Sequence, residues 1–433
     1  MTKTAYEEPP KPFLSLRQII LMNLGFLGLQ FSFGLQQGNM GPIYSYLGAS
    51  QAILPLLNLA GPVTGLLVQP LIGAFSDRTR TKWGRRVPYF IVGAAVCSLC
   101  LFAMPYSGSI AIAAILLWIL VAANNVSMEP YRAYVSDRLV PEQRELGFLT
   151  QSSFTGLAQT LAYVSPVVLV ALGVGANAVS ANGIPVVTHI VFVIGAVISI
   201  SSIVWSALTV PELPAPPLQK QKHSTLGEIF SAIREMPGPM RRMALMSLFQ
   251  WYAMSCYWGY VIYSISETVY GTNVAESSGF RSAVLTNGDI GAFYNLIAAI
   301  AAYAMVPISR RFGPDKVHAM CLVAAGLTML TIPFVHHRDW LFLAVIGVGF
   351  GWGSIMGNPY VMLTDSIPPE RTGVYMGIFN MFIVIPMMLF SLSMPLLYGY
   401  VFHNHAANVL LLGGVLMFFA ALSTLFVRPG SRS

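Results

Sequence analysis

The sequence predicts an all-α integral membrane protein whose twelve transmembrane helices form two parallel six-helix repeats. The prediction follows from the scarcity of charge, the number of long apolar stretches and an internal repeat. Charged residues make up 9% of the 433 residues and hydrophobic residues 55%, and the mean hydropathy is +0.65. Soluble domains carry about 25% charged residues, which keep their surface hydrated. The composition therefore excludes a cytosolic enzyme, a secreted domain and a disordered chain.

Charges and turn residues divide the chain into apolar stretches long enough to cross a bilayer, which takes about 20 residues in a helix. Pro and Gly interrupt several of them, as a helical bundle tolerates. The alternating pattern of an outer-membrane β-barrel is absent from the sequence. We predict spans at 17–40, 51–75, 87–105, 109–135, 146–173, 186–210, 242–269, 286–309, 316–335, 340–364, 373–400 and 407–427.

The basic residues predict the orientation in the membrane. The formal net charge is +7, from 24 Lys and Arg against 17 Asp and Glu. With the N-terminus inside, all basic residues fall on the inner side except Arg281 and Arg338 in outer loops and Arg132 within a span. Because cytoplasmic loops are enriched in Lys and Arg, we expect a multi-pass protein of the cell inner (plasma) membrane with both termini in the cytoplasm. The basic loops also account for the net positive charge, so we do not expect a nucleic-acid partner.

An internal repeat divides the chain into an N-terminal half (1–210), a cytoplasmic linker (211–241) and a C-terminal half (242–433). Segments of the two halves match at nearly one offset and stand at the same topological position in each half. Parallel six-span repeats are typical of transporters whose halves move around a central site. The matching segments are Glu129-Pro-Tyr with Asn358-Pro-Tyr at an offset of 229, Asp137 with Asp365 at 228, and Trp83-Gly84 with Phe312-Gly313 at 229.

Two motifs carry a family resemblance. The segment Gly73-Ala-Phe-Ser-Asp77-Arg78, followed by Gly84-Arg85-Arg86, resembles the loop signature of the major facilitator superfamily. Residues 68–90 and 124–137 together resemble the sucrose/maltose-type proton symporters of the glycoside–pentoside–hexuronide group, in a bacterial member. The resemblance implies the major facilitator fold, a proton as coupling ion and a sugar as substrate.

The chain departs from the plant and sodium-coupled members of that group. It has Val121 where plant sucrose symporters carry an Asp linked to proton coupling, and Glu129 where those proteins carry a small residue. Its second span contains Asn58 but no acid before Asp77, which argues against the sodium coupling of melibiose-type symporters.

Glu129 and Arg132 are the residues that we expect to couple proton and sugar. They stand at i and i+3, so they share a helix face within the fourth span, and a charge inside a span usually marks function. We expect a buried ion pair in which protonation of Glu129 releases Arg132 to bind sugar hydroxyls. The alternative is a static structural pair. Asp289 is a second candidate acid, for which a solvated carboxylate at a helix start is the favoured alternative.

Amide and aromatic side chains inside the spans are the expected sugar ligands. Buried amides are costly in a membrane unless they have partners, and aromatic rings offer a stacking face with a polar tip. For any single residue, the alternative is an interhelical contact or an interfacial belt. Besides Arg132, we expect substrate contacts from Gln36, Asn125, Gln151, Trp258 and Asn358.

Charged residues near the cytoplasmic turns are candidates for a gate. A carboxylate can bind the N-terminal N–H groups of a helix or pair with arginine, and such a latch would break as the halves move. We expect Asp77 to pair with Arg86 or Arg144, and Asp137 with Arg144. The alternative is that the basic residues only set topology. The candidate set is Asp77, Arg78, Arg85, Arg86, Asp137 and Arg144.

Other signals favour a transporter without a metal or organic cofactor, and not an enzyme. Cys97 and Cys100 form a lone C-x-x-C, which we interpret as two small apolar side chains. The glycines between Gly347 and Gly353 lie within a span and indicate close helix packing. Nucleotide-binding motifs are absent from the sequence, so we do not expect ATP-driven transport.

The sequence therefore predicts a monomeric, proton-coupled symporter that imports an α-glucoside disaccharide, such as maltose or sucrose. An uncoupled facilitator or an exporter on the same fold is the first alternative. A polytopic membrane enzyme or receptor is the remote alternative.

Overall fold

The computed structural model describes residues 11–213, 231–367 and 372–427, and in these ranges every regular element is a helix. The all-α prediction is confirmed. The helices of the first half are α1 (Leu16–Tyr46), α2 (Leu54–Leu57), α3 (Ala60–Arg78), α4 (Val87–Ala103), α5 (Ile110–Arg138), α6 (Pro141–Ala171) and α7 (Val186–Thr209). Those of the second half are α9 (Gly238–Thr268), α10 (Ser278–Phe312), α11 (Pro314–Thr331), α12 (Arg338–Ala344), α13 (Ile346–Ile355), α14 (Asn358–Thr364), α15 (Thr372–Tyr400) and α16 (Ala406–Leu425).

Each of the twelve predicted spans corresponds to a helix or to a broken run of helices. In the described residues, 11 helical stretches are long and apolar enough to cross a membrane. The remaining span is α9, whose 31 residues extend about 46 Å at 1.5 Å per residue. Two predicted spans are interrupted. The span at 51–75 consists of α2 and α3, and the span at 340–364 consists of α12, α13 and α14.

Several helices begin earlier than hydropathy predicts because their first turns are polar. Helix α10 begins at Ser278 instead of 286, and the Ser277 side chain caps it by accepting a hydrogen bond from the Phe280 N–H. Helix α1 begins with a capping box between Ser15 and Gln18. Such caps satisfy N–H groups at helix starts, so a helix extends beyond its apolar stretch.

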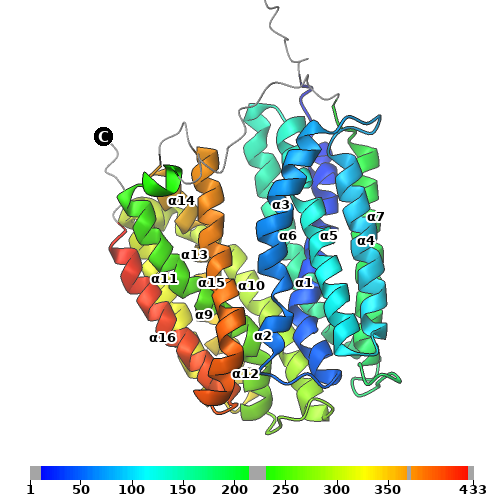
Figure 1. Cartoon of the computed structure of the whole chain (residues 1–433), viewed down its shortest axis with the longest axis vertical. Coiled ribbons are helices and arrows are strands. Elements are labelled where there is room, and N and C mark those ends of the chain that lie inside the picture. The colour runs from blue at the N-terminus through cyan, green and yellow to red at the C-terminus, as the bar shows by residue number, and fades with distance from the viewer. Residues whose placement is uncertain (1–10, 214–230, 368–371, 428–433) are drawn as a thin grey trace, which may run out of the picture.

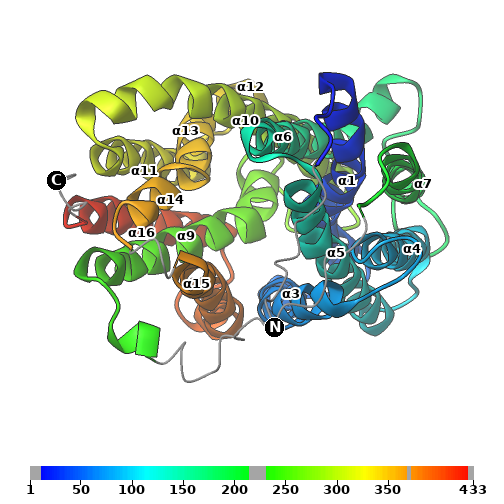
Figure 2. The ribbon, with the colours of Figure 1, turned by 90° about the horizontal axis from the view of Figure 1, so that it is seen from above.

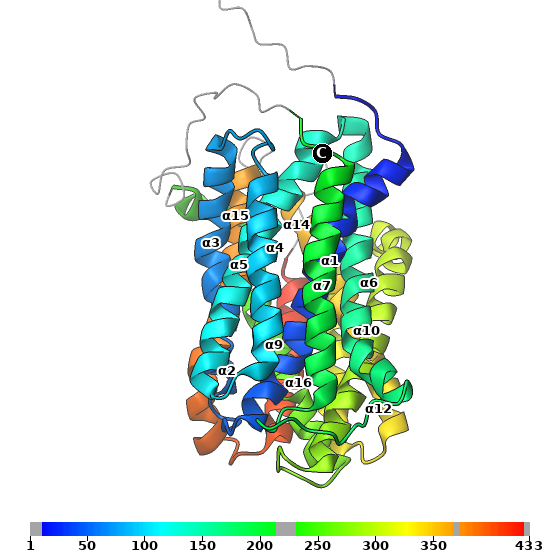
Figure 3. The ribbon, with the colours of Figure 1, turned by 90° about the vertical axis from the view of Figure 1, so that its right-hand side faces the viewer.

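The two halves lie side by side and pack along two seams. Figure 2 shows α6 beside α10 at one seam and α3 beside α15 at the other. Figure 3 shows the helices of the first half running along the long axis of the molecule. In Figure 1 the halves are close at the bottom, and their ribbons diverge toward the top.

The two ends of the bundle differ in charge. We call the end at the top of Figure 1 the basic end, because it contains the turn after α3, with Arg80 and Lys82, and the last turn of α10, with Arg310 and Arg311. We call the other the distal end. Helix α1 begins and α16 ends at the basic end.

The internal repeat is visible in the backbone of the basic turns. Gly84 has φ +103° and Gly313 has φ +95°, in the left-handed region that favours glycine. These glycines are partners at the repeat offset, so the two halves turn in the same way after their second spans.

Close packing accounts for the glycines of α13. A Cβ at Gly347 would lie 2.1 Å from the Ala324 carbonyl oxygen of α11, and one at Gly353 would lie 2.7 Å from the Ala298 carbonyl oxygen of α10. The prediction of close helix packing is confirmed at these positions. The four cysteines are free and buried.

Candidate functional site

The ion pair of the fourth span lies on the basic-end half of α5. Arg132 Nη1 is 3.1 Å from Glu129 Oε1. The Glu129 side chain is 31% exposed and that of Arg132 49%, so the expectation of a buried pair is wrong. Water therefore reaches both side chains in this conformation.

Asp289 is not at a helix start. It lies inside α10, and its side chain is 15% exposed and hydrogen-bonded to Arg338 at the first turn of α12. The expectation of a solvated carboxylate at a helix start is therefore wrong, because α10 begins eleven residues earlier at Ser278. Asp289 stands at the distal end, while Glu129 stands on the basic-end half of its helix.

Asn125 links α5 to α3 in the middle of the first half. Its Nδ2 donates to Thr64 Oγ1 at 2.9 Å, and its Oδ1 accepts from Gln69 Nε2 at 2.7 Å. Asn125 is buried. Both ends of its carboxamide are thus engaged within its own half in this conformation.

Gln36 of α1 and Gln151 of α6 have amide atoms without a partner. Gln36 Oε1 and Gln151 Nε2 are buried and form no hydrogen bond within the described part of the chain. Leaving a buried amide group unpaired costs about 1–3 kcal/mol. Unlike Asn125, these side chains retain unused hydrogen-bonding capacity.

Three tryptophans form a cluster in the second half. Trp258 and Trp251 lie on α9, and both contact Trp352 of α13. The ring centroids of Trp258 and Trp352 are 5.1 Å apart and nearly perpendicular. Sequence reasoning selected Trp258 but missed Trp352, which lies among the glycines of α13.

Asn358 begins α14 at the break in the tenth span. Its Oδ1 accepts from Ser309 Oγ of α10 at 3.0 Å, and its Nδ2 donates to Ser354 Oγ of α13 at 2.8 Å. Asn358 is the repeat partner of Glu129. In transporters, discontinuous helices commonly form the substrate site, so the break belongs to the candidate site.

Hydrogen bonds join the two halves at the distal end. Gln51, in the loop before α2, accepts from the Tyr260 hydroxyl through its backbone oxygen at 3.0 Å and from the Tyr398 hydroxyl through its side chain. The hydroxyls of Ser45 and Tyr263 are 2.9 Å apart. These contacts hold α9 and α15 against the end of α1.

Close backbone approach extends the contact between α6 and α10 toward the middle. A Cβ at Gly291 would lie 2.6 Å from the ring of Tyr163, and one at Gly288 would lie 2.7 Å from the Tyr163 carbonyl oxygen. Only glycine leaves room for Tyr163 here.

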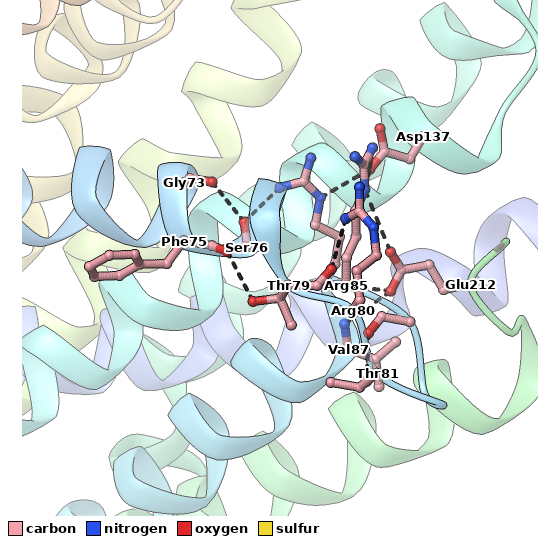
Figure 4. A network of polar contacts seen from close by, with 12 residues as sticks. Gly73, Phe75, Ser76, Thr79, Arg80, Thr81, Arg85, Val87, Asp137 and Glu212 are labelled. Atoms are coloured by element: carbon pink, nitrogen blue, oxygen red, sulfur yellow. Dashed lines mark hydrogen bonds and ion pairs between the residues drawn. The ribbon is translucent and has the colours of Figure 1, made fainter. Parts of the chain in front are cut away.

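A charged network joins the basic turn after α3 to the end of α5 (Figure 4). Arg85 Nη2 and Arg86 Nε lie 2.7 and 3.0 Å from Asp137 Oδ2, and Arg86 Nη1 donates to Ser76 Oγ at 2.6 Å. These four residues belong to the first half. The expected partner of Asp137 was Arg144. The side chains of Arg144 and Asp77 lie outside the described residues, and Arg78 is the last residue of α3.

Glu212 completes this network and was missed by sequence reasoning (Figure 4). Its Oε2 accepts from the backbone N–H groups of Arg86 at 2.8 Å and Val87 at 3.2 Å, at the start of α4. Burial raises the pKa of the Glu212 carboxyl above its ordinary value, and the backbone hydrogen bonds oppose this rise. The only signal in the sequence was an acid between Pro211 and Leu213, which reads as part of a linker.

Two other features lie outside the candidate site. The described residues contain no group of three or more His, Cys, Asp or Glu that could hold a metal ion. An apolar groove of about 820 Å³ lies between α11 and the α12–α13 segment. Its lining includes Leu327, Phe334, Trp340 and Leu343, each more than half exposed, so this groove faces outward.

Comparison with known proteins gives a family match and distant relatives. The family model described as Major Facilitator Superfamily matches residues 22–391 and 257–433. Sucrose transport protein SUC4 of Arabidopsis thaliana is 24% identical over 443 residues, covering 89% of this chain and 85% of that protein. Sucrose transport protein SUT1 of Oryza sativa subsp. japonica is 32% identical over 146 residues, covering 29% of this chain and 27% of that protein.

Solved structures share the fold. The crystal structure of a variant of the nucleoside transporter NupG matches with a TM-score of 0.72 at 15% identity, covering 94% of this chain and 99% of that chain. The inward open xylose transporter XylE from E. coli matches with a TM-score of 0.69 at 14% identity, covering 97% and 98%. These proteins are transporters, in agreement with the expectation that the chain is not an enzyme.

Proposed function

The chain belongs to the Major Facilitator Superfamily, and on that premise we propose that it is a proton-coupled symporter that imports an α-glucoside disaccharide of the maltose or sucrose type. The halves would alternate access to a site between α1, α5 and α6 of the first half and α9, α13 and α14 of the second. The sucrose transport proteins among its relatives support the substrate class.

The observation that carries the proposal is the unused hydrogen-bonding capacity of Gln36 and Gln151. A sugar hydroxyl both donates and accepts, so separate hydroxyls can pair with the free Gln36 Oε1 and with the free Gln151 Nε2. The two amides stand at different depths of the bundle, because Gln159 of α6 lies beside Gln30 of α1, so Gln151 is on the basic-end half of α6 and Gln36 on the distal half of α1. The nearby second half contributes the Trp258 and Trp352 rings, which offer an apolar face to a pyranose. The site thus combines the two kinds of group that sugar binding needs.

Proton coupling is assigned to Glu129 and Arg132. The pair is 3.1 Å apart and partly exposed, so a proton can reach the carboxylate from water in this conformation. Protonation would remove the negative charge that holds Arg132. The guanidinium would then be free to donate hydrogen bonds to the sugar. No cofactor besides the coupling proton takes part in this scheme.

The orientation follows from the positive-inside rule, which places the basic end and both termini in the cytoplasm of a plasma membrane. The contacts at Gln51 and Ser45 then close the outer side. The exposure of Glu129 and Arg132 then corresponds to an inward-facing state. We propose that the transporter acts as a monomer, since the candidate site lies within one chain.

The test is proton movement in proteoliposomes that contain the purified protein and a trapped pH-sensitive dye. We expect external maltose or sucrose to acidify the lumen, and glucose, melibiose and an amino acid not to do so. Radiolabelled sugar exchange is measured on the same vesicles.

The two readouts separate the alternatives. Exchange of labelled sugar without acidification would identify an uncoupled facilitator and leave Glu129 with a structural role. If monodisperse protein gave neither acidification nor exchange of labelled sugar, the assignment of a sugar substrate would be overturned.

A further inference from the structure

A buried histidine in the second half lies outside the proposed coupling pair. His318 of α11 is fully buried. Its Nδ1 is 2.8 Å from Ser354 Oγ of α13, and its Nε2 is 3.0 Å from Gln250 Oε1 of α9. Since an isolated polar ring would be costly in the interior of a membrane protein, both contacts need an explanation.

The donors and acceptors form a chain with one direction. An amide oxygen can only accept, so His318 Nε2 carries the hydrogen that is donated to Gln250 Oε1. Nδ1 of the neutral ring then has no hydrogen and accepts from the Ser354 hydroxyl. Ser354 Oγ in turn accepts from Asn358 Nδ2 at 2.8 Å. The chain extends from Asn358 to Gln250 with every internal donor matched to an acceptor.

The chain crosses the break in the tenth span. Ser354 lies in the last turn of α13, and Asn358 is the first residue of α14. The side-chain hydrogen bond between them spans the break, and His318 fixes the Ser354 hydroxyl from α11. Hydrogen bonds linked in this way rigidify the groups that they join, although Gln250 Nε2, at the far end of the series, has no partner within the described residues.

We propose that His318 is a positioning residue that acts through Ser354 to hold the α13–α14 break and the Asn358 carboxamide in place at the site between the halves. The consequence for substrate affinity rests on the proposed function. The structural consequence does not depend on any substrate: the α13–α14 break opens more often when the series of hydrogen bonds is interrupted.

Two substitutions at His318 interrupt the series of hydrogen bonds at different places. Asn places its Oδ1 near the position of Nδ1, so His318→Asn retains an acceptor for Ser354 and loses the contact with Gln250. Gln is longer and places its Nε2 near that of the ring, so His318→Gln retains the contact with Gln250 and loses that with Ser354. A general packing role would make the two variants equally harmful.

The experiment measures how often α14 separates from its neighbours. Met362→Cys places a thiol at a fully buried position one turn beyond Asn358, and its alkylation in detergent solution is followed by peptide mass spectrometry. The native cysteines are buried and serve as internal references. Alkylation of a buried thiol reports the population of locally open states.

We expect His318→Gln and Ser354→Ala each to raise the alkylation rate at position 362 at least threefold, and His318→Asn to stay within twofold of the parent. The His318→Gln/Ser354→Ala double variant should be no faster than Ser354→Ala alone, because that substitution already removes the hydroxyl through which His318 acts. Leu322→Ala is the packing control. It opens a void beside the same helix but removes none of these hydrogen bonds, so the alkylation rate should stay within twofold of the parent.

Equal rates for the Asn and Gln variants, or a double variant whose effect is the product of the singles, would overturn the proposal. In a second measurement, sugar affinity should fall for His318→Gln and Ser354→Ala and not for His318→Asn. If the parent protein binds none of the sugars, the proposed function fails, while the alkylation rates still decide the role of His318.

Discussion

At the scale of single residues, Glu129 and Arg132 place a titratable group beside a fixed cation. Their separation of 3.1 Å and their partial exposure mean that the pair adds little to folding stability, since exposed ion pairs contribute about 0–1 kcal/mol. Substitutions at this pair therefore report on transport with little change in folding. Gln36, Gln151 and the tryptophans provide binding surface but cannot change charge.

Glu129→Gln should abolish proton-driven accumulation and bring the sugar to equal concentrations inside and outside the vesicles. Counterflow exchange should persist, because exchange needs no net proton movement. Both are measured with radiolabelled sugar in proteoliposomes. Asp289→Asn is the matched control and should accumulate sugar normally, and the reverse pattern would assign the proton to Asp289.

Arg132→Lys should weaken sugar binding roughly tenfold, or about 1.4 kcal/mol, in line with the loss of a hydrogen bond to a charged group. Lys has a point charge and lacks the planar fork with which a guanidinium binds two oxygens. Equilibrium binding of labelled sugar in detergent measures the change. An unaltered affinity would restrict Arg132 to a structural role.

At the scale of elements, the basic turn after α3 is held to the start of α4 by Glu212. The carboxylate accepts two backbone N–H groups, and its side chain is 3% exposed. Gly84 borders the same carboxylate, because a Cβ there would lie 2.2 Å from Glu212 Oε2. The turn, the end of α5 and the start of the linker after α7 therefore behave as one rigid unit.

Glu212→Gln should become more stabilising, relative to the parent, as pH rises. Burial raises the pKa of this carboxyl above its ordinary value of 4.5, so its contribution to stability is complete below pH 4.5 and is lost as pH rises through the raised value. The amide of Gln can still accept from the Arg86 and Val87 N–H groups but does not ionise. The apparent melting temperature of both proteins, followed from pH 4.5 to 7.5, measures the difference.

Glu212→Ala is the contrasting variant at the same position. It leaves two N–H groups without an acceptor, at a cost of about 1–3 kcal/mol, and should melt below Glu212→Gln at every pH. If the difference in melting temperature between the Gln variant and the parent did not change with pH, burial would not raise the pKa of this carboxyl.

At the scale of the whole molecule, the halves are joined at the distal end and diverge at the basic end (Figure 1). Tyr260, Tyr263 and Tyr398 supply the hydroxyls that join α9 and α15 to the first half. Alternating access requires these bonds to break while others form. Each of these hydrogen bonds therefore stabilises the state that is closed at the distal end, relative to the state that is open there, by its own free energy.

Tyr398→Phe should shift that balance toward opening of the distal end. Loss of one hydrogen bond of about 1 kcal/mol changes a two-state population roughly fivefold. Ala49→Cys, at a buried position after α1, should then be alkylated about five times faster than in the parent. Tyr400→Phe, two residues away and 83% exposed, is the matched control and should leave the rate unchanged. Equal rates for the two variants would refute a role for Tyr398 in closure.

The sequence by itself determined the membrane class, the spans, the repeat and the spacing of Glu129 and Arg132. These properties are local or additive: hydropathy is a sum over about 20 residues, and an i, i+3 pair shares a helix face whatever surrounds it. The repeat pairing of Gly84 with Gly313 was also readable, because both turns need the same backbone conformation.

The tertiary structure decided which polar groups are engaged and which are open. Asn125 and Asn358 are paired within their halves, whereas Gln36 and Gln151 are not. The exposure of Glu129 depends on how far apart the halves stand. Glu212 and His318 find partners more than thirty residues away. Such contacts depend on how distant helices pack, and no local pattern in the chain encodes which side chains will meet.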